Sequence, residues 1–227
     1  MSVLLPIDPT VPSRSAVQLA ALVARNLGRD VLMLHVSARP ASLDSLARLH
    51  ELGRGIRESG VPVRLRSVQG EVVERILEVA EARSCSWILM GTRLADGPEA
   101  GPSVARQVLA RARQPVVAVA GAMAHLVENR LPIGVVGPTA PAISRMAEEL
   151  ARLRGSSWAT LAGPDAGGSL GALGGDPALQ LGAVLTRPDQ LWGPGAGLNP
   201  HWRAFLARPE ACAVLVVSEG ADPEAVR

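Results

Sequence analysis

The chain has 227 residues, of which 48% are hydrophobic and 2% aromatic, and its formal net charge at pH 7 is +2. This length allows one large domain or two small ones, and the composition is typical of a folded protein rather than a disordered one. All 23 side chains counted as Lys or Arg are arginines, which excludes lysine Schiff-base chemistry and lysine-dependent phosphate loops.

Charge, hydropathy and cysteine content narrow the class of protein further. Arginines alternate with acids, and no basic stripe carries interleaved aromatic residues, so we expect no nucleic-acid partner. No apolar run approaches 18 residues, and a strand is expected within three residues of the amino terminus, so we expect neither a membrane span nor a signal peptide. Cys85 and Cys212 are predicted to be buried free thiols in a reducing compartment, which favours a cytoplasmic location.

The first 120 residues are predicted to alternate strands with helices. Short apolar runs without alternation are typical of strands that are covered on both faces, and intervening amphipathic segments are typical of helices. We expect strands at residues 3–8, 31–36, 61–68, 87–90 and 116–119. We expect helices with apolar positions from Ala16 to Leu27, at residues 41–59, from Gly70-Glu71 with apolar positions to Ala80, and from Ser103 onward. This order predicts an α/β fold with a doubly wound, five-stranded parallel sheet.

Two of these elements carry more specific predictions. Residues 61–68 alternate between apolar and polar side chains, which predicts a strand at the edge of the sheet. In the helix at residues 41–59, an apolar stripe is predicted to face the core. Its members are Leu43, Leu46, Leu49, Leu52 and Ile56.

A glycine loop joins the fourth strand to the last helix. The apolar run ends at Gly91, the loop contains Gly97 and Gly101, and the helix begins at Ser103. Glycines allow the backbone to approach a ligand closely, and the free amides of a helix start favour an anion. Ser103 would cap the helix or donate to a phosphate. The other interpretation, which stays open here, is that Gly91 and Gly101 only turn the chain.

The pattern begins again after a linker at residues 121–130. Residues 131–137, 141–153 and 158–162 are similar to the first strand, first helix and second strand, and residues 181–187 and 212–217 are similar to the fourth and fifth strands. A glycine-rich segment at 163–177 stands where the first half has a helix, a strand and a helix. We therefore expect a tandem repeat, with a domain at 1–120 and a truncated, degenerate second domain at 131–227.

These features together resemble the universal stress protein family. The resemblance rests on Pro6-Ile7-Asp8, Leu34-His35-Val36, Gly70-Glu71, Met90-Gly91-Thr92-Arg93, Ser103-Val104-Ala105 and Gln114-Pro115-Val116. It implies an adenine nucleotide alpha hydrolase-like fold, a role in the stress response, and ATP or AMP as a ligand, with Mg²⁺ only where ATP is bound. The cofactor-binding residues that it implies are Pro6, Asp8, Val36, Met90, Gly91, Arg93, Gly101, Ser103 and Val104.

The resemblance also implies how the two halves assemble. In this family the last strand commonly pairs across a two-fold axis. A tandem chain would form that pairing internally, between residues 116–119 and 213–217, as a pseudo-dimer of its own halves. A homodimer or a further protein partner is also left open.

The chain departs from the family's nucleotide-binding pattern at two positions. Leu94 stands where the second glycine is expected, and Pro102 stands where the last glycine should precede Ser103. Leucine adds bulk near the phosphates, and proline removes an amide donor. Two functions therefore remain open: an adenine-nucleotide sensor, or a nucleotide-free scaffold or interaction module. Asp8 likewise has two interpretations, as a ligand group or as a turn cap over Thr10 or Val11.

The sequence does not predict an enzyme. No serine or cysteine has a histidine and acid arranged around it, and no histidine has a partner at metal-ligand spacing, so at most slow ATP hydrolysis is expected. His35 is predicted to be a core residue with its hydrogen bonds satisfied. In the second half, Gly137 replaces the aspartate and Leu185 replaces the first loop glycine, and we expect no nucleotide there.

Overall fold

The structure is a computed structural model that describes residues 1–11, 13–92, 103–120, 133–136, 141–161, 183–186 and 213–218. The chain divides into two compact units. The first holds Met1–Thr92 and Val104–Ala118, and the described strands β6 to β9 belong to the second. Within the described ranges, every helix is either too short or too polar to cross a lipid bilayer.

The first unit contains the five strands and four helices that the sequence predicts. The strands are β1 (Ser2–Pro6), β2 (Asp30–Ser37), β3 (Val63–Gln69), β4 (Trp87–Gly91) and β5 (Val116–Ala120). The helices are α1 (Arg14–Asn26), α2 (Leu43–Glu58), α3 (Val72–Ala82) and α4 (Val104–Arg111). The strand order is β3-β2-β1-β4-β5, with parallel pairing of β1 to β2, β1 to β4 and β2 to β3. The predicted α/β fold is confirmed.

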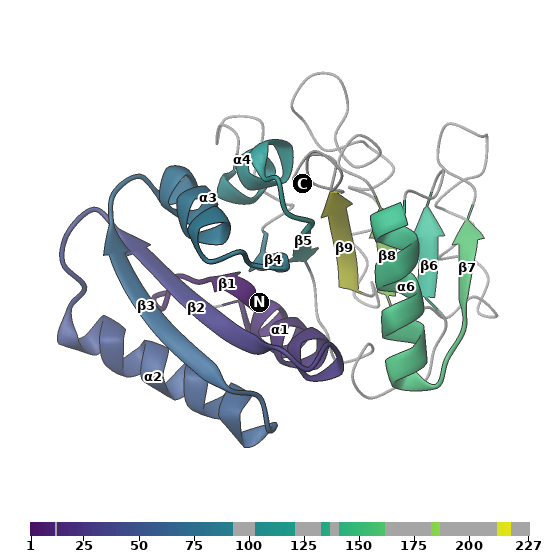
Figure 1. The fold of residues 1–227 in the computed structure, drawn as a ribbon, viewed down its shortest axis with the longest axis horizontal. Helices are drawn as coiled ribbons and strands as arrows, with labels where there is room; N and C mark the ends of the chain where they lie inside the picture. The colour runs from purple at the N-terminus through teal and green to yellow at the C-terminus, as the bar shows by residue number, and fades with distance from the viewer. Residues whose placement is uncertain are drawn as a thin grey trace. The chain divides into compact units, whose positions relative to one another are not determined.

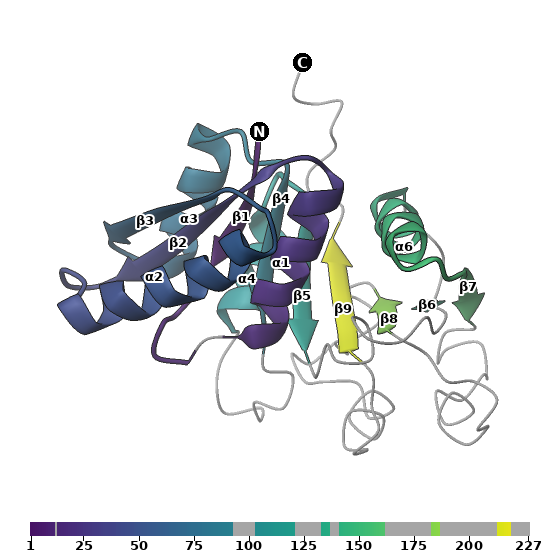
Figure 2. The same cartoon turned by 90° about the horizontal axis from the view of Figure 1, so that it is seen from below.

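Helices cover both faces of this sheet. Figure 1 shows α1 and α2 on one face and α3 and α4 on the other, and Figure 2 shows α1 and α2 from below. Contacts between α1 and α2, and between α3 and α4, agree with this division. Because both faces are covered, side chains of the inner strands such as Leu4, Leu5 and Ile88 are fully buried.

Helix α1 illustrates why the sequence folds this way. Its apolar side chains recur at helical spacing and are buried, and its amino terminus is capped by Ser13, whose Oγ accepts a hydrogen bond of 3.2 Å from the Ala16 amide. Gly28 follows the helix at φ +60°, a conformation that favours glycine. The apolar pattern, the N-cap and the glycine after the helix therefore all indicate the same limits for α1.

Helix α2 differs from the sequence prediction at its start. It begins at Leu43, with Ser42 as its N-cap, and the Leu43 side chain is 86% exposed. The prediction that this stripe faces the core is wrong for Leu43, the first residue of the helix. Leu49 and Ile56 are buried as expected, and Leu46 and Leu52 are half-buried.

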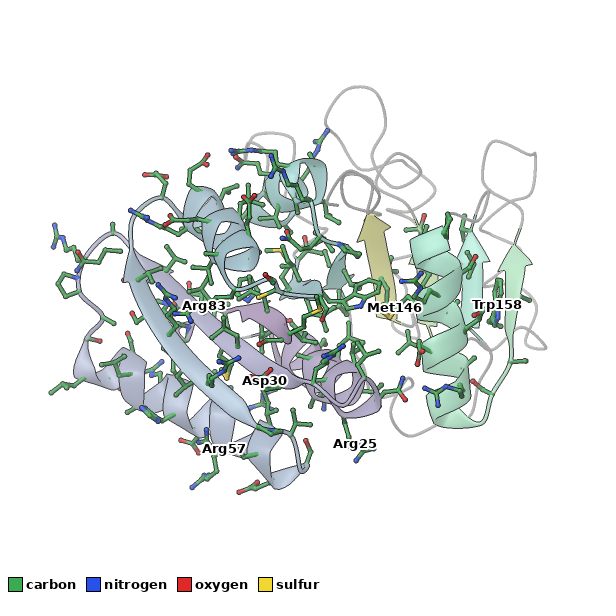
Figure 3. All side chains as sticks on the ribbon, in the orientation of Figure 1. Arg25, Asp30, Arg57, Arg83, Met146 and Trp158 are labelled. Atoms are coloured by element: carbon green, nitrogen blue, oxygen red, sulfur yellow. The ribbon has the colours of Figure 1, made fainter. Side chains whose placement is uncertain are left out.

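The edge position of β3 is confirmed, and it places a charged cluster at the amino ends of the strands. On β3, Arg64 donates a 2.7 Å hydrogen bond to the hydroxyl of Ser2 and forms a 2.5 Å ion pair with Asp30. Asp30 is labelled in Figure 3. Partial burial works to raise the pKa of Asp30, but hydrogen bonding to Ser2 and the charge of Arg64 outweigh it and hold that pKa below its ordinary value. The cluster ties β1, β2 and β3 together at this edge.

The second unit repeats part of this arrangement. Its described elements are β6 (Ile133–Val136), α6 (Pro141–Arg154), β7 (Trp158–Leu161), β8 (Ala183–Thr186) and β9 (Ala213–Ser218). They form a parallel sheet in the order β9-β8-β6-β7, against which α6 buries Ile143, Met146 and Leu150. Each strand lies where the sequence predicts one. The tandem origin of this unit stays a prediction, and residues 121–130 and 163–177 lie outside the described residues.

Candidate functional site

The candidate site lies at the carboxyl ends of β1 and β4. From β1 the chain proceeds to β2 and β3 on one side, whereas β4 and β5 lie on the other side, so the direction of winding reverses between β1 and β4. Parallel α/β sheets bind ligands at such a reversal, outside the carboxyl ends of the strands. The segments after β1 and β4 carry Asp8 and Thr92, and both residues belong to the first unit.

Asp8 is exposed and closes the turn that follows β1. Its Oδ1 accepts a 2.8 Å hydrogen bond from the Thr10 amide and a 2.6 Å hydrogen bond from the Thr10 hydroxyl. Partial burial works to raise the pKa of Asp8, but the Thr10 hydrogen bonds, with help from His35 and the Val11 amide, outweigh it and hold the pKa below its ordinary value. Asp8 is therefore ionised at neutral pH, and its expected role as a turn cap over Thr10 is observed.

His35 is buried in β2 close to the same turn. It is 8% exposed, and its Nδ1 lies 3.4 Å from the carbonyl oxygen of Ile7. The amide of Ile7 in turn donates a 2.9 Å hydrogen bond to the carbonyl of Leu34. These contacts confirm the prediction that His35 is a core residue with a hydrogen-bond partner, and they fix the backbone from which Asp8 projects.

Gly91 ends β4 in close contact with Ser13. A Cβ atom added to Gly91 would lie 2.3 Å from the Ser13 Cβ and 2.5 Å from its Oγ. The same Oγ caps helix α1. The lack of a side chain at Gly91 is therefore required by packing within the protein, and its role in approaching a ligand stays a prediction.

Thr92 follows Gly91 with a buried hydroxyl that lacks a partner. Its Oγ1 is inaccessible to solvent and forms no hydrogen bond with the part of the chain that the structure describes. Buried hydroxyl groups are normally paired, so an unpaired one beside a site calls for an explanation. Thr92 belongs to the Met90-Gly91-Thr92-Arg93 motif, but no role was predicted for its hydroxyl.

Pro6, Val36 and Met90 are the remaining predicted site residues on β1, β2 and β4. Pro6 ends β1 and pairs in register with Leu34, and Val36 lies two residues further along β2, so both are on the edge that carries Asp8. Met90 is buried at 5% exposure, so its side chain is not accessible to a ligand.

The other predicted residues belong to the loop and to the start of α4. Ser103 directly precedes α4, and Val104, its first residue, is 37% exposed. Arg93 and Gly101 lie outside the described residues, as do Leu94 and Pro102.

No group of three or more His, Cys, Asp or Glu side chains in the described ranges could hold a metal ion. The described residues therefore form no ready-made cation site around Asp8, and a cation there would need oxygen ligands from elsewhere. Sequence reasoning missed the contact of Ser13 with Gly91, because it joins residues that are 78 positions apart and no local pattern signals it.

Comparison with known protein families identifies one that matches this chain. The model of the universal stress protein family matches residues 1–120, more than half of the chain. No curated protein sequence matches the chain.

Several solved structures align with the chain, and those with a TM-score of 0.60 or more share its fold. A universal stress protein from Archaeoglobus fulgidus DSM 4304 aligns with 96% of this chain and 96% of its own, with a TM-score of 0.64 and 17% identity. A putative universal stress protein from Pseudomonas aeruginosa UCBPP-PA14 covers 95% of this chain and 92% of its own, with a TM-score of 0.60 and 16% identity. A universal stress protein from Archaeoglobus fulgidus in complex with dAMP covers 52% of this chain and 96% of its own, with a TM-score of 0.43 and 22% identity. On the match over residues 1–120, the chain belongs to the universal stress protein family.

Proposed function

We propose that the first unit binds an adenine nucleotide, AMP or ATP, at the carboxyl ends of β1 and β4, and that the protein acts as a nucleotide-responsive regulator in the stress response rather than as an enzyme. The observation that carries this proposal is Asp8, an exposed carboxylate with a lowered pKa at the point where the winding of the sheet reverses. A carboxylate that is ionised at neutral pH is a strong acceptor for ribose hydroxyls or an adenine amino group.

The geometry of Asp8 would allow its carboxylate to accept a hydrogen bond from a ligand as well as from Thr10. Both Thr10 hydrogen bonds end on Oδ1, so Oδ2 is the oxygen proposed to accept from the nucleotide. Thr10 holds the carboxylate in one orientation before a ligand arrives, which lowers the entropy cost of binding. The turn cap and the ligand contact are therefore compatible roles for one side chain.

The phosphates are proposed to lie toward the end of β4 and the start of α4. On this side of the proposed site, β4 ends at Gly91 and is followed by Thr92. Helix α4 begins at Val104 and is preceded by Ser103. The amino terminus of an α-helix favours a negative charge. Mg²⁺ is proposed to accompany ATP only, because AMP has a single phosphate and Asp8 supplies one carboxylate.

Calorimetric titration with AMP and ATP tests this function. We expect wild type to bind and Asp8→Asn to bind about 10–100-fold more weakly, which corresponds to the loss of about 1.5–3 kcal/mol from one charge-assisted hydrogen bond. Glu58→Gln is the matched control, since Glu58 ends α2 and its carboxylate is 70% exposed. Equal affinities for wild type and Asp8→Asn would refute the role of Asp8.

A second candidate function is a nucleotide-free interaction module. It is favoured by an apolar rim, defined here as Val11, Leu43, Val72 and Val104, whose exposed fractions are 60%, 86%, 37% and 37%. Each of these residues follows a different strand, β1 to β4, at the carboxyl edge of the sheet. Sedimentation of wild type and a Val11→Ser/Leu43→Ser double variant tests this candidate, which predicts self-association that the double variant loses.

A further inference from the structure

His35 is a buried polar side chain whose presence in β2 needs an explanation. The four residues before it, 31–34, are apolar and buried, and His35 itself is 8% exposed. A buried polar group destabilises a protein unless it is hydrogen-bonded, so an apolar residue would be the simpler choice at this position. Among the described residues, the first unit buries one other polar side chain, Ser2, and the cluster of Arg64 and Asp30 accounts for it.

The position of His35 coincides with the end of the hydrogen-bond ladder between β1 and β2. Leu34 pairs in register with Pro6, the last residue of β1, and its carbonyl accepts a hydrogen bond of 2.9 Å from the Ile7 amide. Among the described residues, this is the last backbone hydrogen bond between the two segments. The Ile7 carbonyl comes next along the chain, and Nδ1 of His35 lies 3.4 Å from its oxygen. The imidazole therefore lies where the ladder supplies no further donor.

The chemistry of this contact decides which atom of His35 carries a proton. A backbone carbonyl oxygen has no hydrogen to donate, so a hydrogen bond to it requires a proton on Nδ1. The distance is at the long end of the range for a hydrogen bond, but the contact is buried, and hydrogen bonds are stronger away from water. The contact thus fixes the orientation of the ring and of the Ile7 carbonyl together.

The Ile7 carbonyl belongs to the peptide group that leads into Asp8. Because a peptide group is planar, holding its carbonyl oxygen also sets the direction in which the Asp8 backbone leaves the sheet. One residue further, the Asp8 carboxylate accepts the two hydrogen bonds from Thr10. The turn after β1 is therefore held at two points, by His35 at its start and by Thr10 at its tip.

We propose that His35, with a proton on Nδ1, is the positioning residue of the Asp8 carboxylate. The inference rests on the nucleotide-binding function proposed above, since a carboxylate that is already held in one orientation binds a ligand at a lower entropy cost. His35 acts through the backbone of Ile7 and does not touch the nucleotide. Its removal is expected to loosen the turn and to weaken binding without abolishing it.

Two NMR measurements on the ligand-free protein test the positioning itself. Long-range proton–nitrogen spectra are expected to show a proton on Nδ1 of His35. ¹⁵N relaxation is expected to show rigid Asp8 and Thr10 amides in wild type, and in His35→Leu their order parameters should fall from about 0.85 to below about 0.6. The order parameter of the Leu5 amide, in the buried part of β1, should not change.

Two variants separate the hydrogen bond from other effects of the substitution. His35→Asn places an amide nitrogen near the position of Nδ1 and is expected to restore most of the rigidity of the Asp8 turn. His50→Leu is the matched control, because it makes the same replacement at an exposed position of α2, and it should leave the turn unchanged.

Calorimetric titration with AMP tests the consequence for binding. We expect His35→Leu to bind roughly 3–10-fold more weakly than wild type, and His35→Asn to bind nearly as tightly as wild type. In the Asp8→Asn background, His35→Leu should have no further effect, because His35 acts only through Asp8.

A proton found on Nε2 alone, or equal order parameters at Asp8 in wild type and His35→Leu, would overturn the proposal. Additive losses of AMP affinity in the double variant would overturn it as well. If wild type bound no AMP, the nucleotide function would fail, whereas the two measurements on the ligand-free protein would still decide the role of His35.

Discussion

Substitution of Gly91 by alanine tests whether packing against Ser13, rather than backbone freedom, requires the glycine that ends β4. The φ angle of Gly91 is not in the left-handed region, so alanine is allowed by the backbone and only the space is at issue. The added Cβ would lie 2.3 Å from the Ser13 Cβ. Carbon atoms in contact are normally ~3.5–4.0 Å apart, so Ser13 must move by more than ~1 Å.

The cost follows from what this displacement disrupts. Forcing one methyl group into a packed region costs about 1–3 kcal/mol, and moving Ser13 weakens the cap of α1, which contributes about 0.5–2 kcal/mol. We therefore expect Gly91→Ala to lower the free energy of unfolding by about 2–4 kcal/mol, a large share of the ~5–15 kcal/mol of a typical domain. The measurement is equilibrium urea unfolding of the ligand-free protein, followed by circular dichroism.

A double-mutant cycle makes the result specific to this contact. Ser13→Gly removes both clashing atoms, and glycine at an N-cap costs only a few tenths of a kcal/mol. Gly91→Ala in that background should therefore cost at least ~1 kcal/mol less than in wild type. Gly55→Ala is the matched control, because no atom lies within 4 Å of its added Cβ, and it should stabilise α2 by about 0.5–1 kcal/mol. Additive costs of Gly91→Ala and Ser13→Gly would refute the reasoning.

Three further predictions concern titratable groups. Thr10→Val removes the hydroxyl that donates to Asp8 and should move the pKa of Asp8 up toward its ordinary value, as measured by NMR titration; an unchanged pKa would show that the turn does not set it. Asp30→Asn should lower the free energy of unfolding at neutral pH, as measured by urea unfolding. The gap in free energy between wild type and variant should shrink as the pH falls through the lowered pKa of Asp30, because a protonated Asp30 no longer stabilises the fold. A gap that is independent of pH would contradict this. Burial raises the pKa of the Cys85 thiol and shields it from solvent. In a Cys212→Ser variant, a thiol reagent should therefore modify Cys85 only as fast as the protein unfolds. Rapid modification of the folded protein would refute the burial of Cys85.

Local patterns in the sequence predicted the fold well where each pattern has a single physical cause. Runs such as residues 87–90 are apolar throughout because helices cover both faces of the sheet, and the alternation of residues 61–68 reflects the edge position of β3. The predicted burial of Leu43, the first residue of α2, failed because apolar spacing alone does not show which turns of a helix pack against the sheet.

The candidate site was predictable only in part. Asp8 was identified because a carboxylate directly after a buried strand is a local feature, and both of its interpretations could be stated in advance. Two features depend on three-dimensional packing, which leaves no periodic signal in the sequence. They are the contact between Gly91 and Ser13, and the buried Thr92 hydroxyl, which has no partner among the described residues. A glycine that is required by a distant serine looks the same in sequence as one that is required by a phosphate.

The central claim is that the carboxyl ends of β1 and β4 form a nucleotide site, and an NMR titration of the ¹⁵N-labelled protein with AMP tests it most directly. The account predicts saturable shifts of the Asp8, Val36 and Thr92 amides. It also predicts no comparable change at Asp30 and Arg64, which lie at the opposite ends of the strands. An amide spectrum that is unaffected by millimolar AMP, or shifts confined to the Asp30 and Arg64 edge, would contradict it.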